Sequence, residues 1–185
     1  NRTWDQIFFQ RFDSVDGTAL TAATNISEST WAKSPSIAST QGVYAAVWQE
    51  AVGTNDMSSD IYVRTLDAQG QAQGPPAALH PATGNSYDPE IIGVSEGFVV
   101  VWSDTRDAQR GVYVTRISAT GEAVTAPERV DTPSDQSSAM RPRIAAGQGA
   151  HGVVWEDARE GNNEIYFATV DDNGAPSQPI RLTHD

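Results

Sequence analysis

Apolar and polar positions alternate in short runs along the whole chain, and no stretch shows the period of an amphipathic helix. Three of these runs are almost wholly apolar and end on a tryptophan, at Val43–Trp48, Phe98–Trp102 and Gly152–Trp155. Short runs that are rich in valine and bounded by turn residues are typical of strands buried on both faces. The pattern therefore predicts an all-β protein.

Each tryptophan is followed by a polar loop and then by a second run in which apolar and polar residues alternate, as in Ile61–Leu66 and Ile165–Val170. A turn that contains glycine comes next, and glycine supplies the positive φ that a tight hairpin needs. Weaker, more polar runs complete the pattern, as expected of outer edge strands. They lie at Ala77–His80, Arg129–Asp131 and Pro179–Thr183.

Before each tryptophan run lies a short run that begins with proline. These runs are Pro35–Ser39, Pro89–Gly93 and Pro142–Ala146. Proline is tolerated at the first position of a strand, where its missing N–H group need not join the ladder. We therefore expect each of these strands to start at its proline.

The four-strand unit repeats at a nearly constant step. The interval is 54 residues from Trp48 to Trp102 and 53 from Trp102 to Trp155, and the three prolines keep the same step. Four antiparallel strands in each unit of this length are the signature of a β-propeller blade. We therefore predict a half-blade at residues 1–33 and blades at approximately 34–87, 88–140 and 141–185.

This strand count gives fourteen strands, or about three and a half blades. An open propeller exposes a sheet edge and an uncovered blade face, and such edges invite pairing with other chains. We therefore expect the 185 residues to be part of a larger ring, completed by a second polypeptide or by further blades.

Composition narrows the functional classes. The net charge is −12 with only 12 Lys and Arg residues, which argues against binding to nucleic acid. The absence of cysteine excludes disulfides, thiolate metal sites and cysteine nucleophiles. No apolar run approaches the roughly 18 residues that span a bilayer, so membrane insertion is not expected.

The hairpin Trp102-Ser-Asp-Thr-Arg106 with Val112-Tyr113, and its counterpart Trp155-Glu-Asp-Ala-Arg159 with Ile165-Tyr166, resembles a repeat of secreted bacterial β-propeller proteins. The resemblance covers nearly the whole chain and implies a propeller fold and an extracellular or periplasmic location, more than any activity. The first full unit departs from it, because Glu50 follows Trp48 without an arginine and the loop is three residues longer.

Loops at one face of the predicted propeller carry the candidate binding residues. Trp31 and Tyr87 are aromatic residues suited to stacking on a sugar. The acidic and basic candidates are Asp104, Arg106, Asp157 and Arg159. Two interpretations remain: they bind a cation or a sugar hydroxyl, or the aspartates accept backbone N–H groups of their own loops while the arginines pair with carboxylates. Recurrence in successive blades favours the second, structural interpretation.

A metal is a further alternative. Asp157, Asn162 and Glu164 supply oxygen atoms of the kind that Ca²⁺ prefers, although no EF-hand-like run is present. Calcium is therefore a candidate cofactor. The three histidines fall at unrelated points of the repeat, so they predict neither a metal site nor a catalytic triad.

The sequence favours a non-catalytic recognition or scaffold module that binds a glycan or a protein through its loop face. One alternative is a portion of a secreted glycoside hydrolase, or of another hydrolase, whose carboxylates are shared with further blades. Another is a structural subunit of an extracellular or envelope assembly. These assignments rest on the fold more than on a site.

Overall fold

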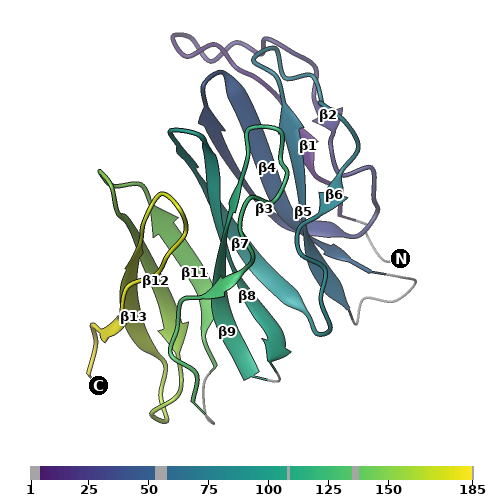
Figure 1. Ribbon diagram of the computed structural model, residues 1–185. Helices are drawn as coiled ribbons and strands as arrows, with labels where there is room; N and C mark the ends of the chain where they lie inside the picture. Colours follow the sequence, from purple (N-terminus) through teal and green to yellow (C-terminus); the bar gives the residue numbers. More distant parts are fainter. Residues whose placement is uncertain (1–4, 53–57, 108, 135–137, 185) are drawn as a thin grey trace.

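A computed structural model describes residues 5–52, 58–107, 109–134 and 138–184 of the protein. Within these residues the chain forms fourteen strands in four separate antiparallel sheets, as predicted. The sheets lie side by side in chain order, with the N-terminal half-blade at one end and the C-terminal blade at the other (Figure 1). The described part of the chain contains no helix long and apolar enough to cross a membrane.

The half-blade has two short strands, β1 (Phe8–Phe9) and β2 (Thr24–Asn25), which pair with each other. The next blade contains four strands in the order in which they occur along the chain. They are β3 (Ala32–Thr40), β4 (Val43–Ala51), β5 (Ser59–Leu66) and β6 (Ala77–Ala78).

The second and third full blades repeat this meander. The second consists of β7 (Ser86–Val94), β8 (Gly97–Asp107), β9 (Gln109–Ile117) and β10 (Glu128–Arg129). The third consists of β11 (Met140–Ala145), β12 (His151–Asp157), β13 (Glu164–Val170) and β14 (Ile180–Arg181). The fourth strand of every full blade has only two residues, in keeping with a polar outer edge.

Apolar clusters fill the spaces between neighbouring sheets. Each cluster joins an apolar face of one sheet to the face of the next sheet that carries its tryptophan. Trp48, Trp102 and Trp155 are almost fully buried, with exposed fractions of 0%, 0% and 1%. Burial of an aromatic side chain of this size is a large favourable contribution to folding, so the tryptophans hold adjacent blades together, as the repeat predicted.

The inner strands β3, β7 and β11 lie next to one another, with β7 in the middle (Figure 1). Thr40 on β3 donates a hydrogen bond from Oγ1 to the carbonyl oxygen of Val94 on β7, at 2.7 Å. All three strands begin before their prolines, which corrects the prediction that they start there. The proline occupies a bulge where the ladder shifts register, and its missing N–H group is tolerated at this position.

Candidate functional site

The same backbone distortion recurs in all three inner strands. Ser34, Asp88 and Arg141, each just before a proline, have positive φ angles of 53°, 50° and 51°. A residue other than glycine in this region carries a strain on the order of 1–3 kcal/mol, and such residues gather at functional sites. The bulges therefore mark the start of the inner strands as the first place to look for chemistry.

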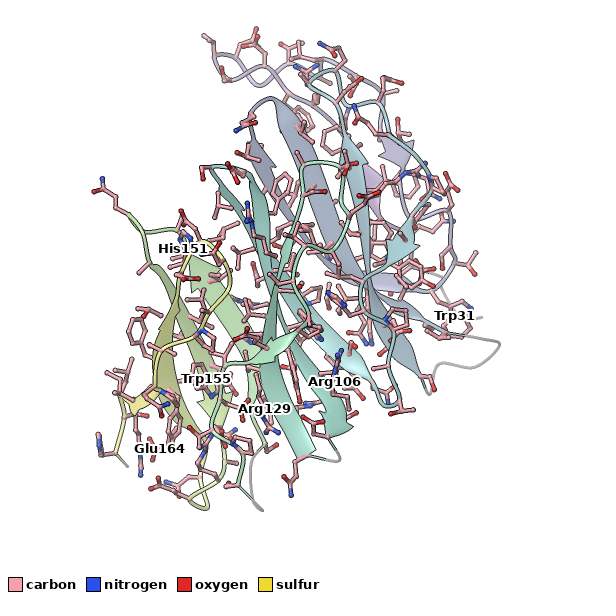
Figure 2. All side chains as sticks on the ribbon, in the orientation of Figure 1. Trp31, Arg106, Arg129, His151, Trp155 and Glu164 are labelled. Atoms are coloured by element: carbon pink, nitrogen blue, oxygen red, sulfur yellow. The ribbon has the colours of Figure 1, made fainter. Side chains whose placement is uncertain are left out.

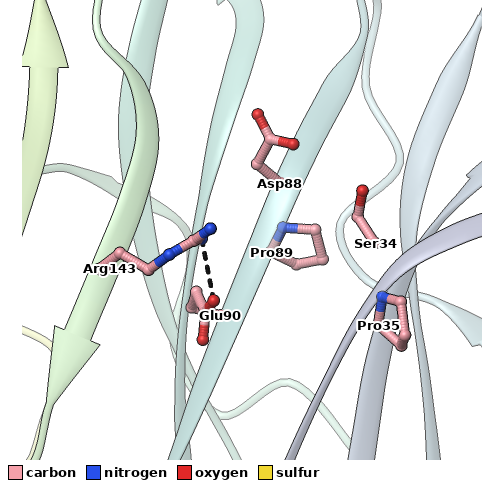
Figure 3. Close-up of a pocket in the computed structure, with 6 residues that line it drawn as sticks. All are labelled: Ser34, Pro35, Asp88, Pro89, Glu90 and Arg143. Atoms are coloured by element: carbon pink, nitrogen blue, oxygen red, sulfur yellow. Dashed lines mark ion pairs between the residues drawn. The ribbon is translucent and has the colours of Figure 1, made fainter.

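A pocket of about 180 Å³ lies between these strands (Figure 3). Its lining comes from all three inner strands and is mainly polar. The lining residues are Ser34, Pro35, Asp88, Pro89, Glu90 and Arg143. No single blade forms the pocket alone, because β3, β7 and β11 each supply at least one of these residues.

Glu90 is held from both sides in this pocket. The guanidinium of Arg143 forms an ion pair with Oε1 at 2.9 Å, and the Ser36 hydroxyl donates to Oε2 at 3.0 Å. Glu90 itself is on β7, so its partners come from the two adjacent blades. A carboxylate with both oxygens engaged in this way keeps a fixed orientation.

Asp88 provides a second carboxylate in the same pocket. It is half-buried, and among the described residues nothing pairs with its oxygens. Its side chain points away from the Arg143–Glu90 pair (Figure 3). The pocket thus combines a fixed carboxylate with one that is open to a ligand or to water.

The candidate residues predicted in the loops lie outside this pocket, near the strand ends that those loops join. Arg106, Arg129 and Glu164 lie toward one end of their sheets, whereas His151 lies toward the other (Figure 2). Asp104 has an exposed fraction of 1%. Its Oδ2 atom accepts hydrogen bonds from Trp102 Nε1 and Ser86 Oγ at 2.9 Å each, and pairs with Arg106 at 2.7 Å. Arg106 also donates its backbone N–H to Oδ1 at 2.7 Å.

These contacts determine the charge state of Asp104. Burial alone would raise the pKa of this carboxyl, but the hydrogen bonds from Arg106 and Trp102 outweigh burial and lower it below its ordinary value. The Arg106 guanidinium also lies 5.6 Å from the centre of the Trp102 ring and 5.0 Å from that of Tyr113. Asp104 and Arg106 therefore form a compact unit inside blade two.

Asp157 and Arg159 form the corresponding unit in blade three. Arg159 donates its backbone N–H to Oδ1 of Asp157 and its Nε to Oδ2, both at 2.9 Å. It also lies 3.8 Å from the carboxylate of Asp131 in the preceding blade. Burial by itself would lower the pKa of Arg159, but hydrogen bonding and charge attraction from Asp157 raise it. The contacts expected from the structural interpretation are thus present in both blades.

The two aromatic candidates are half-buried. The Arg110 guanidinium lies 4.3 Å from the centre of the Tyr87 ring and covers one of its faces. Trp31 receives a hydrogen bond on its backbone carbonyl from Ala51, at 3.1 Å. Ligand binding by the aromatic and charged loop residues stays a prediction.

The residues proposed for a metal do not form a separate cluster. Asp157 and Glu164 face each other across β12 and β13, and Asn162 is in the intervening loop. Glu164 is engaged by Arg181 at 2.6 Å and by the Thr183 hydroxyl. Within the described ranges, no group of three or more His, Cys, Asp or Glu side chains is arranged to hold a metal ion. Calcium binding likewise stays a prediction.

The sequence interpretation missed the pocket residues. The available signal was the residue that follows each repeated proline, which is Ser36, Glu90 or Arg143. One is neutral, one acidic and one basic, at equivalent positions of adjacent inner strands. This pattern becomes a charge pair only when the strands are side by side.

No protein-family model matches the sequence, and no curated protein matches it at a significant level. Solved structures match the fold. An α-L-arabinofuranosidase from Lactobacillus brevis has a TM-score of 0.62 at 14% identity, with 97% of this chain and 66% of that one covered. The arabinofuranosidase arb93a from Fusarium graminearum, an E242A mutant with an iminosugar inhibitor, has a TM-score of 0.64 at 13% identity, covering 96% and 59%.

A family 117 glycoside hydrolase from Zobellia galactanivorans is also similar, with a TM-score of 0.56 at 13% identity, covering 98% of this chain and 61% of that one. The chain thus spans less than two thirds of the length of each of these proteins. The likeness shows that its fold is part of a β-propeller.

These neighbours correct the leading functional expectation. The sequence favoured a non-catalytic recognition or scaffold module, whereas the similar solved structures named above are glycoside hydrolases. The expectation rested on the loop carboxylates, which are engaged by residues of their own loops. It did not consider Asp88 and Glu90, which line the inner-strand pocket.

Proposed function

We propose that these blades are part of a glycoside hydrolase, with a reaction centre at the inner-strand pocket and carboxylates shared between this chain and further blades. The observation that carries the proposal is the presence of Asp88 and Glu90 in one pocket lined by three blades. Support also comes from the glycoside hydrolases that share the fold.

The chemistry of glycoside hydrolysis requires two carboxyl groups on either side of the scissile bond. One donates a proton to the leaving oxygen, and the other acts as an ionised base or nucleophile. Glu90 suits the second of these roles by its position, because Arg143 and the Ser36 hydroxyl hold its two oxygens in place. Asp88, whose oxygens are open to the pocket, is suited to orient water or a sugar hydroxyl.

A general acid must direct its proton at the leaving oxygen. Glu90 is unsuited to this role because Arg143 and the Ser36 hydroxyl already engage both of its oxygens. We therefore assign the general acid to the blades that complete the ring. Action outside the cytoplasm is part of this proposal, supported by the resemblance to repeats of secreted propellers.

The experiment assays the native protein with a panel of aryl glycosides that begins with α-L-arabinofuranosides, because several of the fold neighbours are α-L-arabinofuranosidases. Glu90→Gln should lower kcat by roughly 10²–10⁴-fold with little change in Tm. Asp88→Asn should also lower kcat. Glu96→Gln is the matched control, since Glu96 is exposed and pairs with Arg116 outside the pocket.

Two results contradict the proposal. One is the absence of hydrolysis of every glycoside in the panel by the native protein. The other is hydrolysis whose rate is the same in Glu90→Gln, Asp88→Asn and Glu96→Gln. If Glu90→Gln loses kcat and its Tm also falls strongly, the loss can be due to unfolding. The kcat of Asp88→Asn then decides, because that substitution removes no contact with a described residue.

A further inference from the structure

Strands β1 and β2 reproduce the outer half of a complete blade. Ile26 donates its backbone N–H to the carbonyl oxygen of Ile7 at 2.8 Å, and the Ser27 hydroxyl accepts the N–H of Ile7 at 3.2 Å. Equivalent backbone bonds recur in the complete blades. They join Leu79 to Ile61, Val130 to Val112 and Leu182 to Ile165. The half-blade is therefore a formed outer pair of strands.

Phe8 occupies the position of the repeated tyrosine. In every complete blade this tyrosine lies directly opposite the tryptophan of the second strand, and the two rings stack with centroids 6.0–6.4 Å apart. The tyrosines are Tyr62, Tyr113 and Tyr166. Phe8 is 58% exposed, whereas Tyr113 and Tyr166 are 3% and 6% exposed.

Phe12, three residues beyond β1, shows the same contrast. It forms a bridge with Ala19, as Leu66 does with Ala72 in the first full blade. The equivalent residues Leu66, Ile117 and Val170 are fully buried and lie opposite the start of the second strand. Phe12 is 58% exposed. Two phenylalanines thus stand uncovered where a second strand would cover them.

The backbone of this edge is also open. The backbone N–H and carbonyl groups of Ile7 point toward β2. In an antiparallel strand these groups point to opposite edges in successive residues, so those of Phe8 point to the other edge of β1. Among the described residues, no strand pairs with that edge of β1. An unpaired edge with apolar side chains is a site for strand addition.

We infer that the free edge of β1 binds a pair of strands of the same repeat type, supplied by a segment outside these 185 residues, so that the half-blade becomes a full blade. The second strand of that segment ends in Trp-x-Asp or Trp-x-Glu, and its indole stacks on Phe8. The complete blades show this arrangement three times in the same chain.

A second copy of this chain is a poor occupant of the edge. Its tryptophan-bearing strands β4, β8 and β12 are each already paired on both sides within their own sheets. The inference concerns the outer half-blade and not the inner-strand pocket, so its test can succeed or fail whatever the hydrolase assay shows.

The test uses a dye-labelled synthetic peptide that copies residues 140–159, which contain a first and a second strand with Trp155. Fluorescence anisotropy should show that the peptide binds the 185-residue protein. The peptide with Trp155→Ala should bind on the order of tenfold more weakly, because it lacks the stacking ring. The protein variant Phe8→Ser should weaken binding of the original peptide to a similar extent.

Val15→Ser is the matched control, because Val15 is 93% exposed in the turn of the half-blade and away from the edge. A fusion that places the same peptide ahead of residue 1 tests the interaction at high effective concentration, and should raise Tm in a manner that Phe8→Ser abolishes. No binding together with no rise in Tm overturns the inference. So does binding that Phe8→Ser leaves unchanged, or a dimer of the protein that Phe8→Ser dissociates.

Discussion

The first and second full blades carry the same tryptophan at the same repeat position, yet the carboxyl group two residues later has a different environment in each. The Trp48 indole donates to Glu50 at 2.7 Å, and the Trp102 indole donates to Asp104 at 2.9 Å. Asp104 also has Arg106 beside it and is almost fully buried. Glu50 has no arginine in its loop and is half-buried.

The pKa values of the two groups move in opposite directions. Burial raises the pKa of Glu50, and hydrogen bonds from Trp48 and Ser29 offset this only in part. Burial also acts to raise the pKa of Asp104, but Arg106 and Trp102 reverse the effect and lower it. Hydrogen bonds from a tryptophan and a serine therefore do not offset the burial of Glu50, whereas a tryptophan together with an arginine does so for Asp104.

The arginines also connect successive blades. Arg106 donates to the carbonyl oxygen of His80 in the preceding blade at 3.4 Å, and Arg159 lies close to Asp131 of the blade before it. At the junction with the half-blade, Arg64 takes this role from a different position. It donates to the carbonyl oxygen of Ile26 at 3.0 Å and pairs with Glu28 at 2.8 Å. Each junction thus contains at least one arginine, but not at one fixed repeat position.

The largest predicted effect comes from removal of the carboxyl group in blade two. Asp104→Ala leaves the Arg106 guanidinium, whose side chain is only 16% exposed, without its counter-charge. It also removes the acceptor of the Trp102 and Ser86 hydrogen bonds. We expect a loss of about 3–5 kcal/mol in the free energy of unfolding, measured by urea denaturation at neutral pH.

Glu50→Ala is the matched change in blade one. It removes one acceptor from a half-buried position and leaves no arginine unpaired, so its cost should be about 1–2 kcal/mol. Equal losses in the two variants would contradict the conclusion that Arg106 causes the difference between the two blades.

A smaller effect distinguishes blade two from blade three. Nothing in the described structure accepts a hydrogen bond from the buried Trp155 indole, although Arg159 engages the Asp157 carboxylate two residues later, as Arg106 engages Asp104. Trp102→Phe removes a bond to a charged acceptor, whereas Trp155→Phe removes an unsatisfied donor. The first substitution should therefore lower the free energy of unfolding by about 2 kcal/mol more than the second.

Both substitutions shrink the side chain by the same amount, so the packing loss largely cancels in this difference. The free energy of unfolding is again obtained from urea denaturation, from the midpoint and the slope of the transition. A greater loss in Trp155→Phe would show that the indole N–H has an acceptor in solution.

The sequence predicted the fold because its main determinants are periodic. The repeated tryptophans, such as Trp48, bury against the neighbouring sheet, and the glycine turns fix the hairpins, so the step of 53 or 54 residues determines the blades. The contacts of Asp104 with Arg106 were also predictable, since the two residues are neighbours in one loop. Local spacing was sufficient for these features.

The pocket was not predictable in the same way. Glu90 meets Ser36 and Arg143 only because three inner strands lie next to one another, and these residues are separated by more than 50 positions in the sequence. The positive φ of Asp88 depends on a bulge that the proline pattern alone did not reveal. The missing acceptor of the Trp155 indole was likewise not predictable, because Trp102 and Trp155 have the same spacing to an aspartate and only Trp102 donates to it.

The smallest predicted effect is the pH dependence that separates Glu50 from Asp104. A carboxyl with a raised pKa in the folded state stabilises the fold while it is protonated, and this contribution is lost as the pH rises through the raised pKa. The glutamine in Glu50→Gln has no proton to lose, so only the wild type loses this contribution. The stability of the variant relative to wild type should therefore improve as the pH rises from below the ordinary glutamate pKa of about 4.3 toward neutrality.

Asp104→Asn should show the opposite trend. A lowered pKa stabilises the fold above the ordinary aspartate value of about 3.9, and this contribution is lost as the pH falls through the lowered pKa. The deficit of Asp104→Asn relative to wild type should therefore be greatest near neutrality and shrink in acid. Urea midpoints between about pH 3 and pH 7 measure both trends. Parallel pH profiles for the two variants would show that Arg106 does not set the charge state of its neighbour.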